Sequence, residues 1–339
     1  MNPENVILIT GANGEIGHGL IAELCIRQTS RIIATDIQPL DTTLSGECHE
    51  FLQGDITDPS LFERLEREFP ITTIFHLASI LSTKAERDPE TAQRVNVEGA
   101  LNLLRLATSL TTRSGHPVTF LYPSSIAAYG LPDAAAKHKA GKVREDDWLE
   151  PATMYGCNKL SCEHLGRYYG AHYRRLAAEP PAARLDFRAL RFPGLISALT
   201  VPTGGTSDYG PEMLHHAAQG KPYACFVRAD SRLPFMAMPD AVKALLQLEA
   251  APRARLTRTV YNVTSFSLTA EEFLRLVHQA FPGAQVTFEP DASRQGIVDS
   301  WPADIDDAAA RRDWGWAPDF DQRRAFEEYL IPTIRQRYS

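Results

Sequence analysis

The sequence predicts an α/β protein with a doubly wound parallel sheet, and two observations support this prediction. Short apolar runs alternate with helical patterns over the first 130 residues, which is typical of parallel strands joined by right-handed crossovers. After residue 194, short strands, helices and loops rich in Pro and Gly are mixed, and no linker or internal repeat separates the two halves. We therefore expect a smaller C-terminal lobe that is interleaved with the sheet rather than an independent domain.

The expected elements follow one another in chain order. The apolar run 6–9 predicts a first buried strand, and the pattern at 17–27 predicts the helix after it. A helix over 59–69 is expected to start at Asp58, because Asp is a favoured N-cap and the proline that follows suits the first helical position. The same patterns place further strands at 31–36, 74–77, 118–122 and 187–191, and further helices at 92–110, 155–173, 210–219, 239–250 and 269–281.

Two segments interrupt this rhythm. The segment 132–147 is polar and is expected to be a surface loop. The segment 176–181, rich in Ala, Pro and Arg, is expected to be an exposed insertion.

The composition narrows the class of protein. The chain has 339 residues, of which 44% are hydrophobic and 23% charged, so disorder and fibrous repeats are excluded. The net charge is −7 and no basic stripe is visible, so we expect no nucleic-acid or membrane partner. The first residues lack the basic region of a signal peptide, and the five cysteines form no CxxC pair. We therefore expect a cytoplasmic enzyme with reduced thiols.

A glycine-rich loop stands directly between the first strand and the first helix. Gly11, Gly14 and Gly17 permit a tight turn, close approach to a pyrophosphate, and packing of the helix on the strand. Asp36 ends the second strand, where a carboxylate would accept hydrogen bonds from ribose hydroxyls, and no arginine follows to bind a 2′-phosphate. This pattern predicts a Rossmann-type fold that binds NAD rather than NADP. The residues expected at the cofactor here are Gly11, Asn13, Gly14, Glu15, Ile16, Gly17 and Asp36.

A second motif, YxxxK, places Tyr155 and Lys159 one helical turn apart on the same face. A free phenol has a pKa of about 10, and we expect the Lys159 ammonium to favour the phenolate so that Tyr155 serves as a base. Ser124 and Ser125 follow the strand 118–122, and a parallel sheet puts them at the same carboxyl edge as the glycine loop, so a serine hydroxyl there could orient a substrate hydroxyl. The other interpretation, an amphipathic core tyrosine, stays open for YxxxK alone.

Short motifs spread over nearly the whole chain carry a family resemblance. They are 76–82, 96–99, 123–126, 155–159, 191–197, 204–209, 232–241, 261–264, 299–302 and 313–316. Together they resemble the extended short-chain dehydrogenase/reductase family. Within it, the later motifs resemble most the short-chain type of L-threonine 3-dehydrogenases, which are relatives of the UDP-galactose epimerases.

The resemblance implies an oxidation of the β-hydroxyl of L-threonine to 2-amino-3-oxobutyrate with NAD. It implies Tyr155 as the general base, Lys159 as its electrostatic partner and Ser125 as the residue that orients the hydroxyl. The usual family residues at 125 and 207 are threonines, and the serines here keep the hydroxyl. Further residues implied at the cofactor are Asp55, Ile56, Leu77, Ala78, Asn96, Pro193 and Leu195, besides Tyr155 and Lys159, and those implied at the substrate are Ser82, Ser125, Tyr155, Thr206 and Ser207.

We expect two lobes and a homodimer. The NAD-binding domain should comprise 1–194 and about 239–264, and the substrate lobe 195–238 and 265–339. Apolar residues on more than one face of the helices 92–110 and 155–173 predict a two-fold interface, and relatives use the corresponding pair. These residues are Leu103, Leu106, Leu160, Leu165 and Tyr169.

Other functions stay open at this point. A sugar-nucleotide epimerase or dehydratase, a dehydrogenase of another small 3-hydroxy acid, and a dinucleotide-sensing protein without catalysis would all use this fold. The intact Tyr155 and Lys159 disfavour the last. The ten histidines show no ligand spacing, so no metal site is expected.

Overall fold

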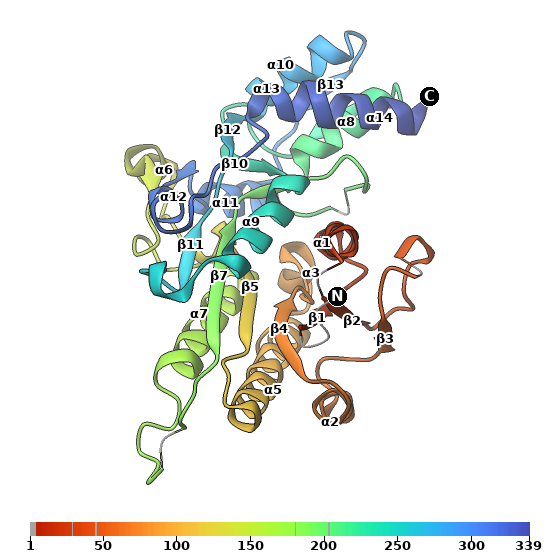
Figure 1. Ribbon diagram of the computed structural model, residues 1–339. Helices are drawn as coiled ribbons and strands as arrows, with labels where there is room; N and C mark the ends of the chain where they lie inside the picture. The colour runs from red at the N-terminus through yellow and green to blue at the C-terminus, as the bar shows by residue number, and fades with distance from the viewer. Residues whose placement is uncertain (1–4, 29, 45, 180, 203) are drawn as a thin grey trace.

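A seven-stranded parallel sheet forms the centre of the molecule (Figure 1). The computed structural model describes residues 5–28, 30–44, 46–179, 181–202 and 204–339. Its strand order is β11-β7-β5-β4-β1-β2-β3, and every neighbouring pair is parallel. The strands are β1 (Val6–Thr10), β2 (Arg31–Asp36), β3 (Glu50–Gln53), β4 (Ile71–His76), β5 (Thr119–Ser125), β7 (Asp186–Phe192) and β11 (Val260–Asn262). The prediction of a doubly wound parallel sheet is confirmed.

Helices cover both faces of this sheet, and the alternation of side chains along β1 shows why. Ile7 and Ile9 pack into one core cluster with α1 and α9, whereas Leu8 packs into the cluster on the opposite face. The first face is covered by α1 (Glu15–Arg27), α9 (Met238–Ala250) and α12 (Ala308–Trp314), and the second by α2 (Pro59–Glu68), α5 (Gly99–Ser114) and α7 (Met154–Ala171).

The sheet order reverses between β1 and β4, because β1 has β2 on one side and β4 on the other. In open parallel sheets such a reversal leaves a crevice at the carboxyl ends of the strands, and ligands bind there. The glycine loop after β1 and the residues after β4 and β5 therefore meet at one edge.

A second lobe lies beyond that edge, above the sheet in Figure 1. Phe235, Phe273 and Phe326 lie in its core. Its helices are α8 (Tyr209–Ala218), α10 (Ala270–Ala280), α11 (Ala292–Ser300), α13 (Gln322–Arg324) and α14 (Ile331–Tyr338). Its small sheets pair β8 (Gly194–Ile196) and β12 (Phe266–Thr269) with β10 (Arg232–Ala237), β9 (Tyr223–Cys225) with β13 (Val286–Phe288), and β6 (Lys142–Val143) with β14 (Asp304–Ile305).

The segment 132–147 is not the surface loop that its polarity predicts. It forms α6 (Ala134–Ala140) and β6, and the side chains of Lys137 and Glu145 are buried. The Lys137 ammonium donates to the Val298 carbonyl over 2.7 Å, and a Glu145 carboxylate oxygen accepts from the Asn262 N–H over 3.1 Å. Buried polar groups persist when they are paired in this way, so the prediction was wrong because distant partners satisfy these charges.

The segment predicted as one helix over 92–110 consists of three pieces. A short helix α4 (Pro89–Gln93) leads into a π-helical turn at 94–98, and α5 follows. A further short helix, α3 (Ser82–Arg87), comes just before them. The insertion near 176–181 has neither helix nor strand among its described residues, and Leu176 is fully exposed, as expected.

The division of the chain into two lobes stays a prediction, and the structure differs from it in one segment. The helix α12 and Trp316, placed by the prediction in the substrate lobe, pack into the core cluster of α1 and α9 against the large sheet. The strand β11 at the edge of this sheet follows β10 in the chain, so the two lobes exchange segments.

Three of the five residues that predicted a dimer, Leu103, Leu106 and Tyr169, are buried in the chain's own core.

All five cysteines are free. No helix in the described part of the chain is long and apolar enough to cross a bilayer. Residues 1–4, at which no signal peptide was predicted, and Pro180 of the insertion lie outside the described residues.

Candidate active site

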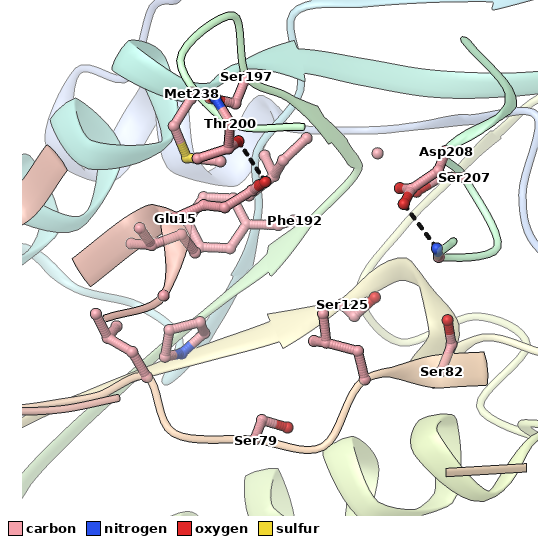
Figure 2. Close-up of a pocket in the computed structure, with 18 of the residues that line it drawn as sticks. Glu15, Ser79, Ser82, Ser125, Phe192, Ser197, Thr200, Ser207, Asp208 and Met238 are labelled. Atoms are coloured by element: carbon pink, nitrogen blue, oxygen red, sulfur yellow. Dashed lines mark hydrogen bonds between the residues drawn. The ribbon is translucent and has the colours of Figure 1, made fainter. Parts of the chain in front are cut away.

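A cavity of about 610 Å³ lies at the carboxyl edge of the large sheet, between the sheet and the second lobe. It brings together most of the residues that the sequence predicted for the site. Those that line it are Gly11, Asn13, Gly14, Glu15, Ile16, Gly17, Leu77, Ser82, Ser125, Tyr155, Lys159, Pro193, Leu195, Thr206 and Ser207. In Figure 2, Glu15, Thr200 and Met238 lie at one end of the cavity and Ser82 at the other.

The glycine loop leaves no room for side chains where it turns. Gly11 has φ +72°, and a Cβ there would lie 2.6 Å from the Ala78 backbone nitrogen. A Cβ on Gly17 would lie 2.4 Å from the Ala12 carbonyl oxygen. The turn therefore needs glycine at both positions, and it presents bare backbone and the start of α1 to the cavity, which is the cradle that a pyrophosphate needs.

Asp36 ties this loop to the end of β2. Its carboxylate accepts from the N–H of Asn13 over 3.0 Å and from the N–H of Gln38 over 3.0 Å. The Asn13 side chain in turn donates to the Pro39 carbonyl and accepts from the Asp41 N–H, both over 2.9 Å. A carboxylate has about four acceptor positions, so Asp36 keeps capacity for the ribose hydroxyls beside the glycine loop.

Asn96, a predicted cofactor residue, does not line the cavity. It is buried, and its side chain accepts from the Ile80 N–H over 2.7 Å, donates to the Ile80 carbonyl over 3.0 Å and donates to Asn158 over 3.1 Å. Asn96 therefore fixes the loop after β4, from which Leu77 and Ser79 reach the cavity.

Asp36, Ala78, Asp55 and Ile56 also lie outside the cavity lining. Ala78 lies directly against Gly11. Asp55 and Ile56 follow β3, the strand next to β2. The Asp55 carboxylate accepts from the Thr57 N–H over 2.8 Å, and Ile56 is buried against Gly99. Asp55 and Ile56 therefore lie at the carboxyl edge beside Asp36, but they do not line the cavity.

Tyr155 and Lys159 project from α7, whose N-cap is Thr153. The Lys159 ammonium donates to the Pro123 carbonyl over 2.7 Å and lies 5.3 Å from the centre of the Tyr155 ring. Burial lowers the pKa of Lys159 to about 8. Burial also raises the pKa of Tyr155, and a hydrogen bond with Ser125 opposes that rise.

The expected lowering of the Tyr155 pKa by Lys159 is therefore not achieved by the protein alone. Loss of water around the phenol disfavours the phenolate more strongly than the neighbouring hydroxyl favours it. Ser125 ends β5, and its Oγ accepts from the Ala127 N–H over 3.1 Å. The three predicted catalytic residues thus lie around one cavity, and the burial of that cavity opposes ionisation of Tyr155.

The other end of the cavity is formed where the two lobes meet. The Thr206 hydroxyl donates to the Ser82 hydroxyl over 3.0 Å. The Thr83 hydroxyl donates to the Gly204 carbonyl over 2.8 Å. Figure 2 shows Ser207 above Ser82 in the same view. Hydroxyls from both lobes therefore surround this end, as the predicted substrate residues require.

Sequence reasoning missed several residues of the lining, above all Asp208 and Thr200. Asp208 accepts from the Gly205 N–H over 2.6 Å, and the Thr200 hydroxyl donates to the Glu15 carboxylate (Figure 2). Asp208 stands beside the predicted Thr206 and Ser207, so this motif held the signal. Thr200 belongs to no motif, and its position depends on the fold.

Comparisons with known proteins agree with this geometry. Residues 7–264 match the model of the NAD dependent epimerase/dehydratase family. The mitochondrial L-threonine 3-dehydrogenase of Bos taurus is 35% identical, and the match covers 93% of this chain and 79% of the relative.

Two solved structures are also similar over nearly the full length. A monomeric L-threonine 3-dehydrogenase from a metagenome database, in its apo form, is 35% identical with a TM-score of 0.83, covering 98% of this chain and 100% of that one. The holo form of the L-threonine dehydrogenase from Cupriavidus necator is 34% identical with a TM-score of 0.83, covering 98% and 99%. The chain therefore belongs to the NAD dependent epimerase/dehydratase family of extended short-chain dehydrogenases/reductases, and it is an NAD-dependent dehydrogenase.

Proposed function

We propose that the chain oxidises the β-hydroxyl of L-threonine to 2-amino-3-oxobutyrate, with NAD as the acceptor. The observation that carries this proposal is the convergence of Ser125, Tyr155 and Lys159 on the cavity that also holds the glycine loop. The names of the relatives support the substrate.

In the proposed mechanism, the glycine loop and Asp36 hold the dinucleotide, and Leu77, Pro193 and Leu195 line its nicotinamide side. When bound, NAD would supply the hydride acceptor and the positive charge of its nicotinamide ring. That charge is of the sign that the buried Tyr155 needs to ionise. Tyr155 then takes the β-hydroxyl proton of the substrate as the Cβ–H bond breaks, and Ser125 orients the hydroxyl.

The second task of the site is to recognise a small zwitterion. Ser82, Thr206 and Ser207 offer hydroxyls to the carboxylate and the ammonium, and Asp208 adds a negative charge at the same end. Among the described residues of the lining, Lys159 and His18 are the only basic ones. Beyond the glycine loop assigned to NAD, the second diphosphate of a sugar nucleotide would need more positive charge than this lining offers, so the lining favours an amino acid.

A panel of substrates tests this specificity. We expect NADH formation with L-threonine, less with L-serine because it lacks the methyl group, and little with 3-hydroxybutyrate because it lacks the ammonium. A site that pairs both charged groups rejects analogues that leave one partner unsatisfied. Turnover of 3-hydroxybutyrate or of a UDP-sugar without turnover of L-threonine would replace this substrate with one of the other family functions.

Assembly and location are further proposals. We propose a homodimer through α5 and α7. Of the five residues that predicted this interface, Leu160 and Leu165 are only half-buried, and Tyr168 beside them is exposed. One similar protein, the L-threonine 3-dehydrogenase from a metagenome database, is named monomeric. Light scattering at micromolar concentration tests the dimer, and a monomer mass would end this proposal. A cytoplasmic location rests on the five free cysteines, while the bovine relative is named mitochondrial.

A further inference from the structure

Ser124, the serine beside Ser125, also lines the cavity, but its hydroxyl is bonded to a buried carboxylate. The Ser124 hydroxyl donates to a carboxylate oxygen of Glu163 over 2.5 Å. The Glu163 side chain is completely buried, and it lies on α7 one helical turn beyond Lys159. The same helix thus provides the catalytic pair and a buried carboxylate.

Arg191 on β7 holds that carboxylate in place. Its guanidinium donates to the two Glu163 oxygens over 2.8 and 2.5 Å, and it donates to the Glu145 carbonyl over 2.7 Å. The guanidinium also lies 4.7 Å from the centre of the Tyr129 ring. A paired carboxylate only accepts hydrogen bonds, so the shared proton belongs to Ser124.

This arrangement distinguishes the two serines. The proton of Ser124 is committed to Glu163, so Ser124 has none to donate to a substrate. Ser125 accepts from the Ala127 N–H and shares a hydrogen bond with Tyr155, so its hydroxyl stays within the proposed catalytic site. Ser125 is therefore the serine whose hydroxyl can act on a substrate.

Two side chains of α7 also hold two consecutive residues of β5. Lys159 donates to the Pro123 carbonyl over 2.7 Å, and Glu163 accepts from the Ser124 hydroxyl. Because Ser125 is the next residue, these contacts fix its position relative to Tyr155 on the same helix. We propose that Glu163, held by Arg191, is a positioning residue that acts through Ser124 to set Ser125 against Tyr155. The inference rests on the proposed function of Ser125 and Tyr155.

Single and double variants test this role. Ser124→Ala keeps the Glu163–Arg191 pair and should lower kcat about 10-fold, because small displacements of a catalytic group are costly. The dissociation constant for NAD, measured by fluorescence, should not change. Ser109→Ala is the matched control, because the Ser109 hydroxyl also donates to a carboxylate, that of Glu66 on α2, away from the cavity. It should keep the wild-type kcat.

The decisive comparison is the double variant Ser124→Ala/Ser125→Ala. If Ser124 acts through Ser125, the double variant should have the kcat of Ser125→Ala alone, since residues that act as one unit are not additive. A merely structural role would give multiplied losses. Multiplied losses, or a Ser124→Ala variant with wild-type kcat, would overturn the proposal.

Glu163 itself is tested without a lone buried charge. Glu163→Leu alone would leave Arg191 buried and unpaired, so we pair it with Arg191→Met, which removes both charges and leaves Ser124 no acceptor at position 163. This variant should keep a cooperative thermal transition and show the kcat loss of Ser124→Ala; a folded variant with wild-type kcat would contradict the role. All ratios of variant to wild-type kcat are measured with the substrate that forms NADH. A wild-type enzyme inactive with L-threonine therefore refutes the substrate, whereas unchanged ratios refute the positioning role.

Discussion

The Thr206 hydroxyl donates a hydrogen bond of 3.0 Å to the Ser82 hydroxyl, although the two residues stand 124 positions apart in the chain. Ser82 begins α3, which follows β4 of the large sheet, and Thr206 precedes α8 of the second lobe. The neighbouring bond from Thr83 to the Gly204 carbonyl joins the same two segments. The lobes are thus connected at the end of the cavity that we assign to the substrate.

Replacement of Thr206 should affect the substrate and spare the cofactor. Thr206→Ala removes one hydroxyl near the zwitterion, so KM for L-threonine should rise about 10-fold, the cost of one hydrogen bond at a buried site. The affinity for NAD should stay the same. Thr287→Ala is the control, because Thr287 is exposed on β13 and its hydroxyl likewise donates to a side chain, that of Glu289. An unchanged KM in Thr206→Ala would place the substrate elsewhere.

The glycine loop offers a test with a closely matched control. Gly11 and Gly115 both have φ +72°, but a Cβ on Gly11 would lie 2.6 Å from the Ala78 nitrogen, whereas the space around Gly115 is open. Gly115→Ala should therefore cost only about 1 kcal/mol of unfolding free energy for its backbone strain. Gly11→Ala should cost more than that and abolish NAD binding. Calorimetry on both variants checks this, and equal NAD affinity would show that the loop is no cradle.

The sheet, its order of elements and the glycine loop were predictable because each follows from local patterns of apolar residues and from glycines at fixed spacing. The buried charges were not. Glu145 lies against Asn262, 117 positions away, and Glu163 pairs with Arg191 from another element. The only hint in the sequence is that Arg191 lies in an apolar run, where a charge must find a partner.

Cofactor choice depends on Asp36. A 2′-phosphate beside this carboxylate would be repelled, so NAD should be preferred to NADP by at least about 100-fold in kcat/KM. Asp36→Ala should weaken NAD binding about 10-fold or more, since bonds to a charged acceptor are strong. The control Asp133→Ala removes a carboxylate that likewise accepts a backbone N–H, at the start of α6. Equal efficiency with NADP in the wild type would refute the role of Asp36.

His76 predicts how stability depends on pH. It ends β4, contacts the Thr10 hydroxyl at 2.8 Å, and burial together with the nearby Lys159 lowers its pKa from 6.5 to about 3. The unfolded chain therefore binds a proton below pH 6.5 that the folded chain refuses. Stability is fully present above that pH and is lost as the pH falls toward 3.

From pH 6.5 to 4.5 this residue alone should remove about 2 to 3 kcal/mol of unfolding free energy. The variant His76→Asn should lose less unfolding free energy than the wild type, and the difference should be that amount. The variant lacks the imidazole, whereas the carboxylates titrate in both proteins. Urea unfolding at the two pH values measures the difference. Identical losses in the two proteins would mean that His76 is protonated in the folded state.

The site, like the fold, has features that the sequence could predict and features that depend on contacts in the folded chain. Tyr155 and Lys159 were visible as a spaced pair on one helix, and Ser125 as a residue shortly after the end of a predicted strand. The direction in which the Tyr155 pKa shifts was not visible in the sequence, because it depends on how much water the folded cavity excludes. Asn96 was visible in a motif, but its task of holding the loop at Ile80 emerges only from the folded contacts.

The rate of NADH formation from L-threonine and NAD, followed at 340 nm in the wild type and in Tyr155→Phe, tests the central proposal most directly. The substitution removes one oxygen and leaves the ring. The wild type should form NADH steadily, and the variant should lose at least about 100-fold in kcat, the lower range for a general base. Its affinity for NAD should be nearly unchanged. No NADH from the wild type, or a variant that keeps more than about a tenth of the wild-type rate, would contradict the proposal.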